Sequence, residues 1–292
     1  ADARVDGAPR SRVPRLDAEV IHAGADDAGF LDPVPADPSA PAADLAPDQL
    51  AAVTHPGAGC RVIAPAGSGK TRVLTERARV LLRSWGLPAG AMAVVAFNRR
   101  AAEEVVARTS DLPGLRVRTL NALGLRLLPQ GVRTVEEVDV RRVLDRLVDL
   151  PRRAETDPAA PWLEALGRVR LGLRHPGAVE ADLEGDVADL ARVVVDFRAA
   201  LRDQGATDFD DQVLGAVERL LADPPFRRRA QRAARILLVD EFQDLTPAHL
   251  LLLRLLSGPA GGVFGVGDAD QTIYGYSGAT PEWLVSFGDR SP

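Results

Sequence analysis

Residues 64–71 read Ala-Pro-Ala-Gly-Ser-Gly-Lys-Thr, a spacing typical of a loop that binds nucleotide phosphates. Gly67 and Gly69 allow backbone N–H groups to approach phosphate oxygens, and Lys70 can reach the β- and γ-phosphates. The hydroxyl group of Thr71 is placed to coordinate Mg²⁺. We predict that the nucleotide cofactor is bound by Ala66, Gly67, Ser68, Gly69, Lys70, Thr71 and Arg72.

Lys70 is the only lysine of the chain, although lysine and arginine together number 36. Arginine carries a planar, delocalised charge, whereas lysine carries a compact point charge on a thin stem. In a tight phosphate loop, a compact positive charge suits the β- and γ-phosphates better than a planar one. The position of this one lysine therefore supports nucleotide binding independently of the glycines. The strict pattern has glycine at position 64, where this chain has Ala64.

An acidic pair, Asp240 and Glu241, follows the continuous apolar run at residues 235–239. Such a run is typical of a strand buried on both faces of a parallel sheet, and ligands bind where such strands end. Asp240 can hold Mg²⁺ through water, and Glu241 can orient and deprotonate an attacking water molecule. Together with the phosphate loop, the pair predicts triphosphate hydrolysis.

Strands and helices alternate along the chain, which predicts an α/β fold with a parallel sheet. The phosphate loop lies between a predicted strand and a predicted helix, as phosphate loops require. Strands are predicted at residues 61–64, 91–97, 117–120, 235–239 and 262–266. Helices are predicted at residues 48–53, 71–83, 99–108 and 247–256.

The composition changes along the chain and predicts four segments. Residues 1–44 are rich in Pro, Ala and Asp, which is typical of a flexible leader. Residues 45–122 and 206–292 are predicted to form the two parts of the nucleotide-binding core. Residues 123–205 carry Leu, Val, Arg and Asp at helical spacing, with prolines between segments, and predict an inserted, all-helical subdomain.

The overall charge and the cysteine content exclude several classes of protein. A net charge of −5 argues against a chain that wraps wholesale around nucleic acid. The single cysteine, Cys60, cannot form an internal disulfide, and no apolar run reaches membrane-spanning length. We therefore expect a cytoplasmic protein without a membrane partner. We interpret the arginine-rich residues 227–235 as a solvated helix face. The second interpretation is that they form a track that binds the DNA backbone.

Three stretches of the chain together resemble the UvrD/Rep/PcrA helicases of superfamily 1. They are residues 70–75, residues 240–244 and residues 266–276, the last reading Val-Gly-Asp-Ala-Asp-Gln-Thr-Ile-Tyr-Gly-Tyr. The resemblance extends from residue 45 to about residue 280. It implies a RecA-like P-loop motor domain that uses ATP and Mg²⁺ and moves 3′ to 5′ on single-stranded DNA.

The resemblance also implies roles for two glutamines. Gln49 would read the edge of the adenine base. Gln271 would sense the γ-phosphate and couple its loss to the DNA track. An amide suits this second role because it both donates and accepts hydrogen bonds without carrying charge.

The expected DNA surface departs from the family pattern. Asn98, Arg99 and Thr119 can contact phosphates, and Tyr276 can stack on a base, at roughly 1–3 kcal/mol. The family reads Thr-Phe-Thr-Asn-Lys where this chain reads Ala-Phe-Asn-Arg-Arg at residues 96–100. It reads Trp-Arg-Gly where this chain reads Tyr-Ser-Gly at residues 276–278.

The later motifs of the family, which belong to its second motor domain, have no counterpart in the 292 residues. Charge compensation by arginine fingers is worth about 10³–10⁵ in rate. We therefore expect the N-terminal part of a longer helicase, which alone binds nucleotide but hydrolyses it slowly and does not unwind DNA. Alternatives are an ATPase-regulated DNA-binding or partner-recruiting module, the motor half of a helicase–nuclease, and a protein that acts on RNA.

Overall fold

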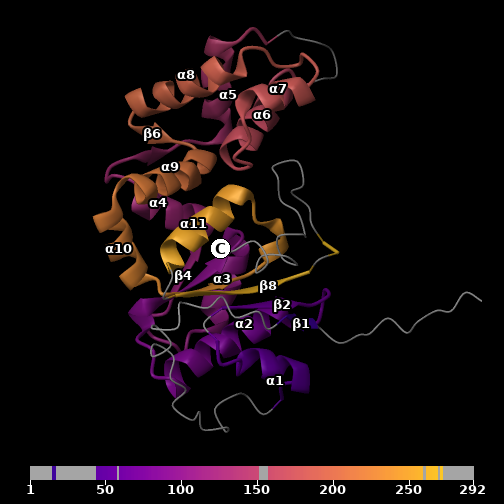
Figure 1. The fold of residues 1–292 in the computed structure, drawn as a ribbon, viewed down its shortest axis with the longest axis vertical. Coiled ribbons are helices and arrows are strands. Elements are labelled where there is room, and N and C mark those ends of the chain that lie inside the picture. The colour runs from indigo at the N-terminus through magenta and orange to yellow at the C-terminus, as the bar shows by residue number, and fades with distance from the viewer. Residues whose placement is uncertain are drawn as a thin grey trace, which may run out of the picture.

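A computed structural model of the chain describes residues 15–17, 44–57, 59–150, 157–258, 261–268 and 270–271. At its centre is a six-stranded sheet in the order β1-β2-β8-β7-β3-β4 (Figure 1). All neighbouring strands are parallel except β1, which pairs antiparallel with β2. The strands are β1 (Arg15–Asp17), β2 (Cys60–Ile63), β3 (Met92–Ala96), β4 (Arg116–Thr119), β7 (Ile236–Val239) and β8 (Gly262–Gly267). The parallel α/β prediction is confirmed.

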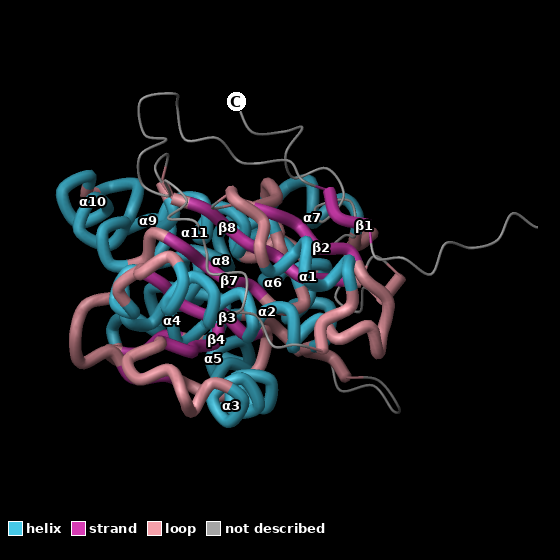
Figure 2. The backbone as a smooth tube through the Cα atoms, turned by 90° about the horizontal axis from the view of Figure 1, so that it is seen from below, coloured by secondary structure: helices cyan, strands magenta, loops and turns pink. Residues whose placement is uncertain are grey.

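The central strands are buried on both faces, as their apolar sequences indicated. Every residue of β3 and of β7 is buried. Alternate residues point to opposite faces of a strand, so Ile236 and Leu238 pack in one hydrophobic cluster and Leu237 and Val239 in another. The sheet is therefore the middle layer between two layers of helices, which Figure 2 shows from below.

One layer of helices contains α1 (Pro47–Val53), α2 (Lys70–Arg79) and α3 (Arg99–Arg108). The other contains α4 (Leu120–Leu127), α9 (Phe209–Ala222), α10 (Pro224–Ala233) and α11 (Pro247–Ser257). The helix predicted at residues 71–83 ends earlier than expected. It passes at Val80 into a π-helical turn, Val80–Ser84, in which Val80 and Leu81 are both buried.

Four further helices bury a hydrophobic cluster of their own, separate from the two clusters beside the sheet. They are α5 (Glu137–Leu147), α6 (Ala160–Arg170), α7 (Pro176–Asp182) and α8 (Leu190–Asp203). Figure 1 shows them together, beyond α4 and α9. None of the helices within the described ranges is long and apolar enough to cross a membrane.

The chain enters and leaves these four helices through a short parallel pair of strands, β5 (Arg133–Thr134) and β6 (Ala206–Thr207). The segment boundary predicted at residue 123 lies within α4. Leu123 of that helix belongs to the same hydrophobic cluster as residues of the sheet. A Cβ atom on Gly124 would lie only 2.4 Å from the carbonyl oxygen of Gln212, so glycine lets α4 approach α9 closely.

Candidate functional site

The phosphate loop connects β2 to α2 at the carboxyl ends of the parallel strands. Gly67 and Gly69 have φ angles of 74° and 89°, in the left-handed region that favours glycine. Lys70 is the first residue of α2, so the N-terminus of this helix faces the loop. A helix N-terminus presents free N–H groups and a partial positive charge to an anion.

The ammonium group of Lys70 is held in place by two acceptors. Its Nζ atom lies 3.4 Å from the carbonyl oxygen of Ala64 and 3.7 Å from Oδ2 of Asp268. The Oγ atom of Ser68, in the same loop, is buried and has no hydrogen-bond partner among the residues that the structure describes. Buried polar groups normally have partners, so this hydroxyl group and the helix N-terminus fit a bound phosphate.

The remaining loop positions are placed around this centre. Ala66 is exposed, and Thr71 and Arg72 are partly buried in the first turn of α2. Gln49, on α1, donates from Nε2 to the carbonyl oxygen of Ser68 at 2.7 Å. Its Oε1 atom accepts from the backbone N–H of Ala46 at 3.2 Å. Both ends of the Gln49 amide therefore contact backbone.

Asp240 directly follows β7 and is only 5% exposed. Burial and the nearby charge of Glu241 together raise the pKa of Asp240 to about 6, whereas the charge of Lys70 acts in the opposite direction. A buried carboxylate beside a second acid gains from a neighbouring cation. Among the described residues no group of three or more His, Cys, Asp and Glu side chains could hold a metal ion. Mg²⁺ that binds with a nucleotide needs only one or two carboxylates.

Glu241 adopts a left-handed backbone conformation, with φ of 49°. Such conformations cost of order 1–3 kcal/mol in a residue other than glycine, and they are found often at functional sites. Oε2 of Glu241 accepts a hydrogen bond from Nε2 of Gln243 at 2.9 Å. Oε1 of Gln243 accepts from the backbone N–H of Asp268, also at 2.9 Å. Gln243 thus links the end of β7 to the end of β8.

The sequence reasoning assigned no role to Gln243 or to Asp268. Gln243 is 2% exposed, and Asp268 is 4% exposed. The Oδ1 atom of Asp268 accepts from the backbone N–H of Asp270, and its carbonyl oxygen accepts from the N–H of Gln271. Gln271, the predicted phosphate sensor, is exposed and lies in this turn beside the ion-pair partner of Lys70.

Replacing Gln243 with methionine should destabilise the chain by about 1–3 kcal/mol, because the buried N–H of Asp268 would lose its acceptor. Urea denaturation measures this change as a lower midpoint. Gln204→Met is the matched control, since Gln204 is exposed and its side chain donates to the carbonyl oxygen of Ala200, in the helix that precedes it. Equal midpoints for the two variants would contradict the linking role of Gln243.

The three predicted DNA contacts that the structure describes lie at the carboxyl ends of neighbouring strands. Asn98 follows β3 and accepts from the N–H of Ala101 at 2.8 Å, which caps α3. Thr119 ends β4 and accepts from the N–H of Ala122 at 3.2 Å, which caps α4. Arg99 is exposed at the start of α3. Tyr276 lies outside the described residues, and DNA contact by any of the four remains a prediction.

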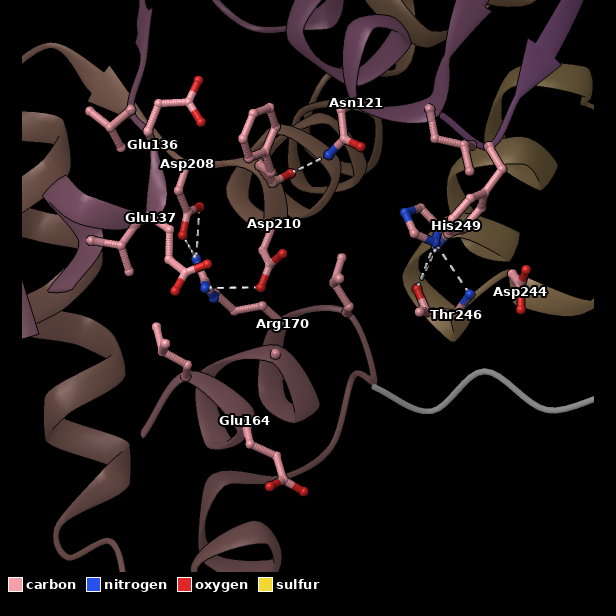
Figure 3. Close-up of a pocket in the computed structure, with 18 of the residues that line it drawn as sticks. Asn121, Glu136, Glu137, Glu164, Arg170, Asp208, Asp210, Asp244, Thr246 and His249 are labelled. Carbon is pink, nitrogen blue, oxygen red and sulfur yellow. Dashed lines mark hydrogen bonds and ion pairs between the residues drawn. The ribbon is translucent and has the colours of Figure 1, made fainter. Parts of the chain in front are cut away.

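A second concave region, a cleft of about 630 Å³, lies between the four-helix cluster and the core (Figure 3). On one side Arg170 donates to both carboxylate oxygens of Asp208, at 2.8 and 2.6 Å, and to Asp210 at 3.0 Å. These bonds attach α6 to the start of α9. On the other side lies His249, whose Nδ1 accepts from the N–H of Thr246 at 3.2 Å. No residue of the phosphate loop lines this cleft.

His249 should make the stability of the chain depend on pH. Burial lowers the pKa of His249 to about 4, from an ordinary value of 6.5. Between these values the unfolded chain binds a proton that the folded chain does not, so its stabilising contribution is present above about pH 6.5 and is lost as the pH falls toward 4. His249→Gln should therefore flatten the dependence of the unfolding free energy on pH.

Urea denaturation between about pH 4.5 and 7 tests this, with an expected difference on the order of 2–3 kcal/mol across the window. Some dependence will remain, because burial and the charge of Arg77 lower the pKa of His55 as well. An unchanged slope in the His249→Gln variant would contradict the assignment.

Comparison with known proteins agrees with this geometry. The family model of the UvrD/REP helicase N-terminal domain matches residues 45–160 and 178–292. Over 270 residues the chain is 33% identical to the ATP-dependent DNA helicase UvrD1 of Mycobacterium tuberculosis (strain ATCC 25618 / H37Rv), covering 83% of this chain and 35% of that protein. Over 264 residues it is 30% identical to the ATP-dependent DNA helicase Rep of Escherichia coli (strain K12), covering 85% and 39%.

A third relative is the ATP-dependent DNA helicase UvrD2 of Mycobacterium bovis (strain ATCC BAA-935 / AF2122/97), 31% identical over 278 residues, with 86% of this chain and 40% of that protein covered. The chain thus spans well under half the length of these relatives. Its parallel sheet, with a glycine-rich loop after β2, is the RecA-like fold that the resemblance implied. Because the family model matches most of its residues, the chain belongs to the UvrD/Rep helicase family, in the region of that family's N-terminal domain.

Proposed function

We propose that this chain is the ATP-binding N-terminal motor domain of a UvrD-like helicase that moves 3′ to 5′ on single-stranded DNA. One observation beside the phosphate loop carries the proposal. Lys70 pairs with Asp268 and acts electrostatically on Asp240. Hydrogen bonds through Gln243 connect the same Asp268 to Glu241. The names of the three relatives support ATP and DNA as substrates.

Each of these side chains has a role in the proposed reaction. The loop N–H groups and Lys70 bind the β- and γ-phosphates, and Gln49 exchanges its contact with Ser68 for the adenine edge. Thr71 and Asp240 would hold Mg²⁺, which supplies neutralisation of the phosphate charge when bound. Glu241, oriented by Gln243, positions and deprotonates the attacking water. Gln271 follows the loss of the γ-phosphate.

The proposal also includes an arrangement of domains. Residues 123–205 act as a helical insertion, and residues 45–122 and 206–292 form the motor core. Single-stranded DNA lies along Asn98, Arg99, Thr119 and Tyr276. A second motor domain supplies the arginine fingers, so the chain alone hydrolyses ATP slowly. The cytoplasm is the proposed location.

Coupling between nucleotide and DNA tests this function. Fluorescence anisotropy of a labelled single-stranded oligonucleotide should report binding, and a Mg²⁺–ATP analogue should change the affinity. Allosteric coupling is typically worth about 5–150-fold, and DNA must change the nucleotide affinity by the same factor. RNA of the same sequence, used as competitor, should displace the DNA poorly. Equal affinities with and without nucleotide, or stronger binding of RNA, would overturn the proposal.

A further inference from the structure

The edge strand β4 carries arginines that the predicted site does not use. β4 is the last strand of the sheet and pairs only with β3 within the described residues. Arg116 and Arg118 occupy alternate positions, so they lie on the same face of the strand. Arg126 follows on α4, the helix that directly continues β4. We call Arg116, Arg118 and Arg126 the arginine edge.

Within the part of the chain that the structure describes, no carboxylate compensates the charges of the arginine edge. Neither Arg118 nor Arg126 has a hydrogen bond or an ion pair with any residue that the structure describes. Burial lowers the pKa of Arg118, and the positive charges of Arg126 and Arg116 lower it further, which places the three groups within electrostatic reach of one another. No carboxylate contributes to this shift.

The protein as a whole is acidic, with a net charge of −5, and many of its other arginines pair with carboxylates. Arg79 and Arg83 share Asp111, and Arg198 pairs with Glu218. Further pairs with acidic partners involve Arg108, Arg141, Arg142, Arg168, Arg174 and Arg192. Among the described residues no carboxylate pairs with the arginine edge, so these guanidinium groups are available to an external anion.

A groove of about 460 Å³ connects the arginine edge to the predicted DNA surface. It lies between α3 and β4, which are neighbours in Figure 1, and is lined by Arg99, Arg118 and Thr119. The other residues that line the groove are alanines and valines, except for Glu103. Arg118 thus shares one surface with two of the residues predicted to contact DNA.

We propose that the arginine edge binds the phosphates of a nucleic-acid strand and extends the track of Asn98, Arg99 and Thr119 along the outside of β4. This inference rests on the proposed function of the chain. Guanidinium groups bind phosphates through paired hydrogen bonds, and most polar contacts between proteins and DNA are made to phosphate and sugar. Continuity with the predicted track favours nucleic acid over an acidic protein segment as the occupant.

The test is the double variant Arg118→Gln/Arg126→Gln. Arg116 is left in place because it donates to the carbonyl oxygen of Ala233, at the end of α10, and so has a structural contact. The matched control is Arg146→Gln/Arg202→Gln, which removes the same charge from two exposed arginines on α5 and α8 that have no described partner. Each protein is titrated into labelled oligo(dT) of increasing length, over a series of salt concentrations.

For long oligonucleotides the double variant should bind several-fold more weakly than the control. The slope of log K against log[salt] should fall by about 1.4, since each phosphate contact to a single strand contributes about 0.7. Short oligonucleotides that occupy only the track should bind both proteins equally. The single variant Arg126→Gln, at an exposed position, should lose about half of the slope change and serves if the double variant folds poorly.

The outcomes separate this inference from the proposed function. If the wild-type chain binds DNA and the double variant matches the control in affinity and slope, the inference is overturned and the proposed function stands. That result would assign the arginine edge to a different anionic partner, such as an acidic protein segment. If the wild-type chain binds no DNA, both proposals are wrong.

Discussion

Replacing Lys70 with alanine should abolish the thermal stabilisation that a Mg²⁺–ATP analogue gives to the wild-type chain. A ligand at 100 times its Kd stabilises the folded state by about 2.7 kcal/mol, which corresponds to several degrees in Tm for a chain of this size. Lys70 is the only lysine, and its Nζ atom lies beside the loop that we propose binds the β- and γ-phosphates. Without that charge, the phosphates would face Asp240, Glu241 and Asp268 uncompensated.

The comparison is made between the Tm values of each protein with and without nucleotide, because Lys70→Ala also removes the ion pair with Asp268. Arg146→Ala removes one exposed positive charge elsewhere and should keep the full shift. Lys70→Arg should lose most of the Tm shift, because a planar guanidinium group would replace the compact ammonium group between Ala64 and Asp268. A shift of wild-type size in Lys70→Ala would show that the nucleotide binds elsewhere.

Replacing Glu241 with glutamine should slow ATP hydrolysis by about 10²–10⁴-fold while nucleotide binding is retained. General-base catalysis by a positioned side chain typically contributes this factor, and an amide cannot accept the proton of the attacking water. The glutamine oxygen can still accept the hydrogen bond from Gln243, so the local geometry is preserved. Phosphate release at saturating ATP measures the rate, and the Tm shift measures binding.

Glu184→Gln is the matched control for this experiment. Glu184 is also a glutamate in the left-handed conformation, with φ of 47°, and it is exposed on the helical side of the molecule. Any general effect of the substitution on the backbone appears in both variants, whereas loss of the base appears only in Glu241→Gln. Hydrolysis at the wild-type rate in Glu241→Gln would refute its role as the base.

Much of the core could be predicted because its signals are local. The apolar run at residues 235–239 became β7, and the helix predicted at residues 99–108 is α3, Arg99–Arg108. A strand buried on both faces needs uninterrupted apolar residues, so its sequence alone identifies it. The phosphate loop was recognisable because glycine at positions 67 and 69 and lysine at position 70 are each required for a separate physical reason.

The contacts that the sequence did not reveal join residues far apart in the chain. Gln243 and Asp268 are 25 positions apart, and Arg170 and Asp208 are 38 apart. Whether such residues meet depends on how strands and helices are arranged, which no local pattern records. The caps at Asn98 and Thr119 are a different case. Asn and Thr before a helix are a known signal for a cap, whereas the prediction from the sequence names both residues only as contacts for DNA.

The most direct test of the central claim is a crystal structure of the chain with Mg²⁺ and a non-hydrolysable ATP analogue. The β-phosphate should lie within about 3 Å of the loop N–H groups, with Nζ of Lys70 on the β- and γ-phosphates. The metal should lie between Thr71 and Asp240. Triphosphate bound in the cleft beside Arg170, with Lys70 still paired only to Asp268, would contradict the assignment.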